Sequence, residues 1–341
     1  MCHCRGNRLL RGSSPPAVFA FISALGVLSI PAQQMAHGNE PIAPVPLNSN
    51  IDPRRAALGG QLFHDSRLSH DQKYSCATCH PLDHGGMDGL PVAKSPVGGS
   101  DLRNTLTVFN VDLNASYNWD GITNNLTDHT ARILENPRLM NMSEAELLSR
   151  VRGDSRYMAA FQSAYPQGLT RASVLDAIAS FERSLLTPNS RFDRFLRGDV
   201  DALSGEEKEG YRLFKAYGCV SCHQGINMGG NLYQKFGVFE EKIPGERSPL
   251  DSGRFRITKA PRDRHVFRVP SLRNVAVTAP YFHDGREPEL KEAVKTMAKA
   301  QLGRRLREDE IDRIVAFLKT LTGKYQGKIL AGPPSGNSED E

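Results

Sequence analysis

The sequence predicts an all-α fold of two domains with long loops between the helices. Three observations lead to this fold class: apolar residues recur at helical spacing, convincing strand alternation is scarce, and one short motif occurs twice. The motif is Cys-x-x-Cys-His, present as "CATCH" at 76–80 and as "CVSCH" at 219–223. A chain of 341 residues is long enough for two domains of ordinary size. The repeat therefore indicates one motif per domain.

The first 36 residues resemble a secretory signal peptide. They carry Arg5, Arg8 and Arg11, then an apolar run over 17–30, then small residues at Ala32 and Ala36, after either of which cleavage could occur. The run is shorter than the roughly 20 residues that a membrane-spanning helix needs. We therefore expect an exported protein with no membrane span. Removal of this segment lowers the formal charge from +5 to about +2, which disfavours nucleic-acid binding.

Two stretches predict helices in the first domain, which we place at residues 37–190. "MSEAELLSRV" begins with Ser143 and Glu146, a helix-capping pair. "TRASVLDAIASFERSLLT" at 170–187 places apolar residues on one helical face. These residues are Val174, Ile178, Phe181 and Leu185. Both stretches read as amphipathic core helices.

The second domain is expected at residues 191–330, after a linker over 187–203. "LSGEEKEGYRLFKAYGC" contains the capping pair Ser204 and Glu207 and leads directly into the second motif. A closing helix follows the acidic turn at 308–310, with one apolar stripe. The stripe consists of Ile311, Ile314, Val315, Leu318 and Leu321. The last residues, 331–341, are polar and are expected to be disordered.

Every cysteine outside the signal segment belongs to one of the two motifs, because Cys2 and Cys4 lie within the segment expected to be removed. Cys-x-x-Cys alone fits a redox dithiol, a zinc site or covalent haem. A zinc site built from both motifs would leave His80 and His223 without a role. A dithiol enzyme would need a thioredoxin-like pattern with strands, which is missing. Covalent haem uses both thiols and the adjacent histidine as iron ligand, so two haem c groups are favoured.

Several longer segments carry a family resemblance, including the two motifs. In order they are "LGGQLFHDSRLS", "SCATCH", "GGMDGLP", "LRNTLTVFN", "NWDG", "CVSCHQGINMGG", "DSGRFRIT", "FRVPSLRNVAVTAPYFHDG" and "LKEAVKTMAKAQLG". Over residues 51–325 the chain resembles the bacterial dihaem cytochrome c peroxidases and their relative MauG, which matures a tryptophan-derived cofactor in methylamine dehydrogenase. The resemblance implies two cytochrome c-like domains and a periplasmic location.

The resemblance also implies a role for each motif. In the family, the N-terminal haem reacts with hydrogen peroxide and the C-terminal haem transfers electrons. The first haem would then be held by Cys76, Cys79 and His80, and the second by Cys219, Cys222 and His223. The second haem of the peroxidases has a methionine ligand, and the matching residue is Met297. By spacing alone Met297 would be a packing residue on a helix.

Two further features are implied by the same resemblance. Family members hold a calcium ion between the haems through an asparagine side chain and two backbone carbonyls, which match Asn104, Thr278 and Pro280. Oxygen ligands of this kind suit calcium. Trp119, the only tryptophan of the chain, matches a residue between the haems that can relay electrons. Without the resemblance Asn104 would be a turn residue and Trp119 a core residue.

The sequence departs from the family at the first haem. The position of the distal histidine, which closes the resting peroxidase haem, falls near Pro96, and proline cannot ligate iron. The family's distal glutamine and catalytic glutamate are replaced by His129 and Leu139. We expect an open first haem, as in MauG, with His129 as the acid–base residue. His129 could instead be a surface or propionate-binding residue, and His84 is a weaker candidate.

Three functions remain open from the sequence. The departures favour a peroxide-using enzyme that oxidises a partner protein, as MauG does and as MbnH does when it converts a partner's tryptophan to kynurenine. The alternative enzyme is a hydrogen peroxide reductase that takes electrons from a small cytochrome c or copper protein, which Met297 favours. The third reading is a dihaem electron carrier, in which His84, Met87 or His129 closes the first haem. A homodimer is compatible with each reading.

Overall fold

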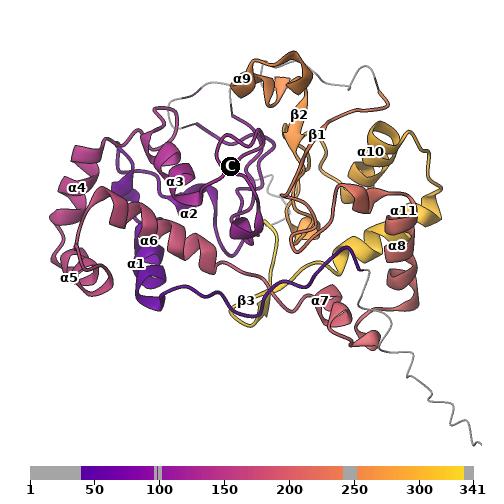
Figure 1. Ribbon diagram of the computed structural model, residues 1–341, viewed down its shortest axis with the longest axis horizontal. Helices are drawn as coiled ribbons and strands as arrows, with labels where there is room; N and C mark the ends of the chain where they lie inside the picture. Colours follow the sequence, from indigo (N-terminus) through magenta and orange to yellow (C-terminus); the bar gives the residue numbers. More distant parts are fainter. Residues whose placement is uncertain (1–39, 96–97, 99–101, 241–251, 334–341) are drawn as a thin grey trace, which may run out of the picture. The chain divides into compact units, whose positions relative to one another are not determined.

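The computed structural model describes residues 40–95, 98, 102–240 and 252–333, and these residues form a mostly helical fold (Figure 1). In the first half of the chain the α-helices are α1 (Pro53–Phe63), α2 (Cys76–Cys79), α3 (Leu126–Glu135), α4 (Glu144–Arg152), α5 (Ser155–Ala164) and α6 (Arg171–Ser184). Short 3-10 helices lie at η2 (Ser66–Leu68) and η3 (Val111–Leu113). Helices α4 and α6 coincide with the two stretches that the sequence predicts to be helical.

The second half contains α7 (Arg191–Leu196), α8 (Gly205–Ala216), α9 (Phe255–Thr258), α10 (Leu290–Leu302) and α11 (Glu308–Lys319). Its 3-10 helices are η4 (Val200–Ala202), η5 (Cys219–Ser221), η7 (Pro261–Asp263) and η8 (Val275–Val277). The strands form two small antiparallel pairs, β1 (Tyr233–Lys235) with β2 (Val266–Arg268), and β3 (Lys324–Tyr325) with β4 (Lys328–Ile329). Strand structure is therefore minor in the described residues, which agrees with the predicted all-α class.

Each domain is built on a helix pair that meets at a glycine. In the first, α1 lies against α6, and a Cβ atom on Gly59 would lie 1.8 Å from the carbonyl oxygen of Ala177. In the second, α8 lies against α11, and a Cβ atom on Gly210 would lie 1.9 Å from the carbonyl oxygen of Arg313. Only glycine allows helices to approach this closely. In both domains the glycine-containing helix precedes the Cys-x-x-Cys-His motif.

Two separate apolar cores surround these helix pairs. The first is formed by α1, α4, α5 and α6, with Leu62, Phe161 and Ile178 fully buried. The second contains an aromatic group in which Phe192 meets Phe317 edge-on at 5.0 Å between ring centroids. Aromatic pairs of this geometry add to the stabilisation that burial provides. The rigid cores fix the loops that carry the two motifs.

The segment 187–203, for which the composition predicts a linker, is folded. It contains α7 and η4, and the side chains of Phe192 and Asp193 are fully buried. Asp193 accepts hydrogen bonds from the Val45 N–H at 3.0 Å and from Arg273 at 2.9 Å. The segment is thus folded and not extended, which its polar composition does not reveal, because the ion pair joins residues far apart in the sequence. Since Phe192 belongs to the second core, we propose that the second domain begins at α7, near the predicted boundary.

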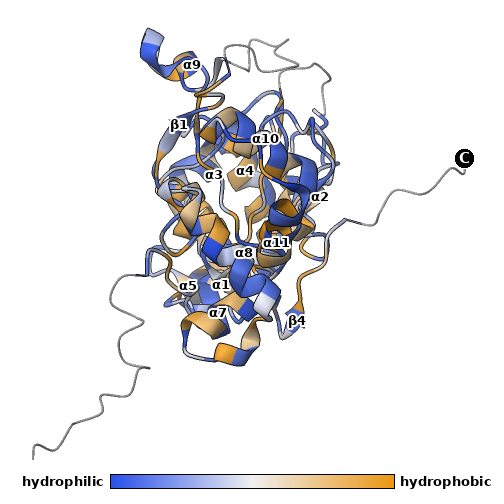
Figure 2. Cartoon of the chain, turned by 90° about the vertical axis from the view of Figure 1, so that its right-hand side faces the viewer, coloured by the Kyte–Doolittle hydropathy of each residue, from blue (hydrophilic) through white to orange (hydrophobic). Residues whose placement is uncertain are grey.

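No helix of the described residues is both long enough and apolar enough to span a bilayer. The helices visible in Figure 2 carry hydrophilic and hydrophobic residues side by side. The predicted signal peptide, Pro96, and residues 334–341 of the predicted tail lie outside the described residues. These three assignments stay predictions.

Candidate haem and peroxide sites

The first motif forms the short helix α2. Ser75 and Thr78 cap its start, with the Ser75 N–H donating to Thr78 Oγ1 at 2.9 Å. His80 follows the helix, is half-buried, and donates from Nδ1 to the Gly86 carbonyl at 3.0 Å. Burial lowers the pKa of His80, which keeps its imidazole neutral. With Nδ1 engaged, Nε2 is the nitrogen that can bind a metal.

The second motif repeats this arrangement in η5. His223 is half-buried and donates from Nδ1 to the Met228 carbonyl at 3.2 Å. Burial lowers the pKa of His223 to about 4, so this imidazole is also neutral at physiological pH. Both histidines are thus oriented by a backbone carbonyl a few residues further along the chain. Such a partner fixes the tautomer of a ligating histidine.

The four motif cysteines form no disulfide with one another. Burial raises the pKa of Cys79 and of Cys219 to about 11. A redox-active dithiol needs a lowered pKa, so the dithiol alternative finds no support. Within the described ranges, no cluster of three or more His, Cys, Asp or Glu side chains suits a metal ion, so a zinc site built from four thiols finds none either. Covalent haem attachment remains.

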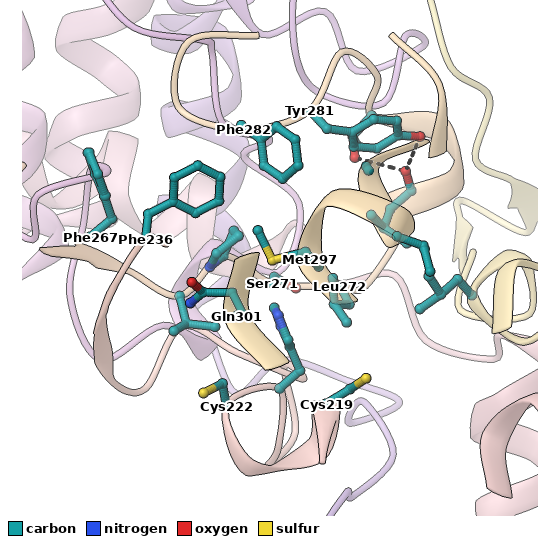
Figure 3. A pocket seen from close by; sticks show the side chains of 18 of the residues that line it. Cys219, Cys222, Phe236, Phe267, Ser271, Leu272, Tyr281, Phe282, Met297 and Gln301 are labelled. Atoms are coloured by element: carbon teal, nitrogen blue, oxygen red, sulfur yellow. Dashed lines mark hydrogen bonds between the residues drawn. The ribbon is translucent and has the colours of Figure 1, made fainter. Parts of the chain in front are cut away.

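A cavity of about 270 Å³ lies beside the second motif (Figure 3). Its lining brings together the possible attachment and ligand residues Cys219, Cys222, His223 and Met297. Cys219 begins η5, Cys222 directly follows this element, and Met297 comes from α10. Most of the remaining lining is apolar, including Phe236, Phe267 and Phe282. Two thiols, an imidazole and a thioether in one apolar cavity fit a covalently attached haem with a methionine ligand.

Trp119 lines the same cavity and is buried. Its indole Nε1 donates to the Asn104 carbonyl at 2.8 Å. The ring belongs to one apolar cluster with Phe236 and Phe267, and Met297 packs against this cluster. The indole is therefore held in the cluster against which the candidate ligand of the second haem packs.

The three predicted calcium ligands also line this cavity. Asn104 is buried and donates from Nδ2 to the Leu90 carbonyl at 3.0 Å. Within the described part of the chain, neither Asn104 Oδ1 nor the carbonyls of Thr278 and Pro280 accept a hydrogen bond. Three acceptors without donors in one cavity suit a hard cation such as calcium. The residues present therefore fit the implied ion.

His129 faces the first motif from α3. Its ring is half-buried and stacks on Tyr117, with 5.5 Å between the ring centroids. Its Nδ1 is buried and has no hydrogen-bond partner in the described residues. Burial is the main cause that lowers the pKa of His129 to about 4, with smaller electrostatic effects from His80, Arg268 and Arg132. The electrostatic effect of His80 on His129 indicates that the two imidazoles belong to the same region of the first domain.

The other candidates at the first haem are placed less suitably. Leu139 packs at the edge of the first core. Met87 is fully buried, and its sulfur accepts a hydrogen bond from the Gly89 N–H at 3.1 Å. His84 has a half-exposed side chain close to Asp83. Met87 is buried but has no side-chain nitrogen, and His84 is not buried. Of the three, His129 has a buried nitrogen without a hydrogen-bond partner in the described residues.

Sequence reasoning missed Glu182 on α6. Thr130 Oγ1 donates to its Oε2 at 3.3 Å, and burial raises the pKa of Glu182 to about 7. Its charge also acts on Cys76 and Tyr117, which places it beside the first motif. The sequence held a partial signal, because Glu182 lies four positions after the buried residue Ile178 and is itself half-buried.

Comparisons with known proteins identify the relatives of the chain. Residues 53–201 match the family model for di-haem cytochrome c peroxidase, and residues 207–322 match the cytochrome c model. The chain is 42% identical over 290 residues to the cytochrome c peroxidase Ccp of Escherichia coli (strain K12). That match covers 85% of this chain and 62% of the relative, so the chain spans about three-fifths of the relative's length.

A second relative is matched over nearly its whole length. The chain is 40% identical to the cytochrome c551 peroxidase of Nitrosomonas europaea, over 92% of this chain and 93% of that protein. Among solved structures, a MauG-like protein associated with microbial copper homeostasis matches with a TM-score of 0.73 and 26% identity, over 85% of this chain and 94% of the other. The predicted fold class and family resemblance are confirmed. Two cytochrome c-type domains imply covalent haem c, and the chain belongs to the di-haem cytochrome c peroxidase family.

Proposed function

We propose that the protein is an exported enzyme in which hydrogen peroxide reacts at the N-terminal haem and a partner protein is oxidised. The observation that carries this proposal is His129, a neutral imidazole near His80 with an unpaired, buried Nδ1. When bound, the haem supplies the iron at which the peroxide bond is broken. The chain supplies the iron ligand, a proton acceptor and a path for electrons.

His129 would accept the proton of the incoming peroxide. Its pKa of about 4 leaves the imidazole neutral at physiological pH, which a proton acceptor requires. Leu139, which replaces the family's glutamate, has no group that can exchange a proton. Stacking on Tyr117 holds the ring of His129 in place. We therefore assign the acid–base role to His129.

Trp119 would connect the two haem sites. It lies ten positions before His129 on the segment that enters α3, and its ring belongs to the apolar cluster against which Met297 packs. An oxidisable ring in this place can pass an electron from the second site towards the first. We assign Cys76, Cys79 and His80 to the first haem, and Cys219, Cys222, His223 and Met297 to the second.

The proposal is tested by adding peroxide to oxidised protein that has never been reduced. We expect the resting protein to contain one high-spin and one low-spin haem, because no iron-binding side chain occupies the position of Pro96. Peroxide should react at once, without prior reduction. Electron paramagnetic resonance and stopped-flow absorbance measure both properties. Two low-spin haems that ignore peroxide would instead identify an electron carrier.

A second candidate function is favoured by the relatives, since those from Escherichia coli and Nitrosomonas europaea are named cytochrome c peroxidases. In this reading a small cytochrome c supplies the electrons. Met297 supports it, because a methionine ligand raises the reduction potential of a haem. Steady oxidation of reduced cytochrome c by peroxide would favour this reading. Peroxide reaction without such turnover would favour oxidation of another partner protein.

Calcium removal provides an independent prediction. With calcium about 100-fold above its Kd, binding should stabilise the folded state by about 2.7 kcal/mol, and a chelator should remove this stabilisation. Urea unfolding of the holoprotein with calcium and with EGTA measures the difference. Asn104→Ala should abolish the calcium response, whereas Asn104→Asp, which keeps a ligand oxygen, should retain it. Equal stability of the wild type in both conditions would contradict the calcium site.

A further inference from the structure

We propose that an exposed basic surface around α9 and η7 is the docking surface for a partner protein whose own contact face is rich in carboxylates. The surface consists of Arg256, Lys259, Arg262 and Arg264. This inference deepens the proposed function, because it rests on the proposal that a partner protein supplies electrons. It names the place where that partner binds and the chemistry that recognises it.

The four side chains are exposed and are not neutralised by their neighbours. Residues 252–265 contain five basic residues and one acidic residue, Asp263. No ion pair joins the four cations of the surface to an acidic side chain in the described parts of the chain. The basic residues of α10 differ, since Lys291 and Lys295 are both paired with Glu308. Unpaired like charges that protrude together favour an acidic partner.

The surface is fixed to the segment that carries Trp119. Arg254, at the start of α9, donates from Nη1 to the carbonyls of Asp120 and Gly121 at 3.1 and 3.2 Å. The Arg268 N–H, on the following strand, donates to the Trp119 carbonyl at 2.8 Å. Figure 1 shows α9 next to the β1–β2 pair. Hydrogen bonds thus connect the segment where the partner would bind to the segment that carries Trp119.

Tyr233 marks the inner edge of the surface. The residue is 37% exposed, and the Arg254 guanidinium lies 4.1 Å from the ring centroid. Its hydroxyl donates to the Gly121 carbonyl at 3.4 Å. An aromatic side chain that reaches both solvent and the Trp119 segment suits the contact region of a redox complex. Aromatic residues and arginines are also the residue types that contribute most to protein interfaces.

An acidic protein fits this surface better than an anionic membrane. Membrane-binding helices carry a long apolar face opposite their basic face. Here α9 has only four residues, and Ile257 is its one large apolar side chain with substantial exposure, at 37%. The surface therefore offers charge without the apolar area that insertion needs.

Binding of oxidised cytochrome c to the oxidised holoprotein tests the proposal. Unmodified cytochrome c is basic, and succinylation of its lysines gives an acidic protein of the same fold. We expect the succinylated form to bind in calorimetry at about 10 mM ionic strength and to bind much more weakly at 150 mM, where charges are screened beyond about 8 Å. The unmodified form should not bind. Failure of the succinylated form to bind would overturn the proposal.

Two variants with the same change of charge locate the binding site. Arg256→Glu, Lys259→Glu and Arg262→Glu in combination should weaken binding by at least about ten-fold. The control combines Arg152→Glu, Lys324→Glu and Lys328→Glu at exposed positions elsewhere and should weaken it far less. An equal loss in both variants would show that only net charge matters and would overturn the docking surface. Phosphatidylglycerol vesicles would also overturn it if they bound as strongly as succinylated cytochrome c and lost as much binding in the first variant.

The peroxide reaction, measured in the same proteins without any cytochrome, separates this inference from the proposed function. Both variants should react with peroxide as fast as the wild type, because the substituted residues lie outside the haem sites. A wild type that ignores peroxide, yet binds acidic cytochrome through the basic surface, would refute the enzyme and leave the docking surface standing.

Discussion

Replacement of His129 by alanine is expected to slow the reaction of the oxidised protein with hydrogen peroxide by about 10²- to 10⁴-fold, the usual contribution of a positioned acid–base residue. Peroxide must lose a proton as it binds and gain one on the other oxygen as its bond breaks. His129 has the neutral, unpaired nitrogen that this transfer requires. Stopped-flow absorbance of protein that has never been reduced measures the rate.

His84→Ala is the matched control for this experiment. His84 is the other histidine of the first domain considered for the site, but its side chain is half-exposed and lies near Asp83. Its removal should leave the rate nearly unchanged. The electron-carrier reading predicts the opposite for His129→Ala, because loss of an iron ligand would turn a low-spin haem high-spin and speed its reaction with peroxide. The two readings are separated by the sign of the change.

The pH profile gives a further check on the same residue. Since the pKa of His129 is lowered to about 4, the imidazole is a proton acceptor above this value and an imidazolium below it. The rate should therefore be constant from neutral pH down to about pH 5 and fall as the pH passes through 4. The His129→Ala variant should lack this fall.

The helices and the haem motifs could be predicted because their signals are local. Capping pairs such as Ser204 with Glu207 and the spacing of apolar residues act within one or two turns. The contacts between helices could not be predicted in this way. Gly59 reads as a weak position in a helix, and only the approach of the Ala177 carbonyl explains it. The buried pair of Asp193 and Arg273, 80 positions apart, likewise leaves no local signal.

The residues of the candidate site also differ in whether local sequence predicts them or only the packing of helices explains them. Residues attached to a motif, such as His80 and His223, follow from the motif itself. The position of His129 follows from the resemblance, whereas its stacking on Tyr117 and its unpaired nitrogen depend on how α3 packs. Glu182 shows the limit most clearly. Its spacing from Ile178 places it near the apolar stripe of α6, but nothing local shows that its charge acts on Cys76.

Glu182→Gln is expected to raise the free energy of unfolding by about 3 kcal/mol at pH 8 and to change it little at pH 4. Burial raises the pKa of Glu182 from 4.5 to about 7 in the folded protein. Above pH 7 the folded state must hold a buried carboxylate that the unfolded state hydrates freely, which costs about 1.4 kcal/mol for each unit of pKa difference. Glutamine never ionises and can still accept the hydrogen bond from Thr130.

The sign of this effect follows from proton binding. Between pH 4.5 and 7 the folded state retains a proton that the unfolded state has lost, so the stability of the wild type falls as the pH rises through this range. Below pH 4.5 both states are protonated, and the wild type and the variant should unfold at the same urea concentration.

Glu206→Gln, at an exposed position in the first turn of α8, is the control and should change stability by less than about 1 kcal/mol at either pH. A Glu182→Gln variant that is equally stabilised at pH 4 and pH 8 would show that packing, and not the buried charge, sets the effect. A variant that is destabilised at pH 8 would show that the Glu182 carboxylate has a positively charged partner. The prediction that Glu182 is protonated beside the first haem would then be wrong.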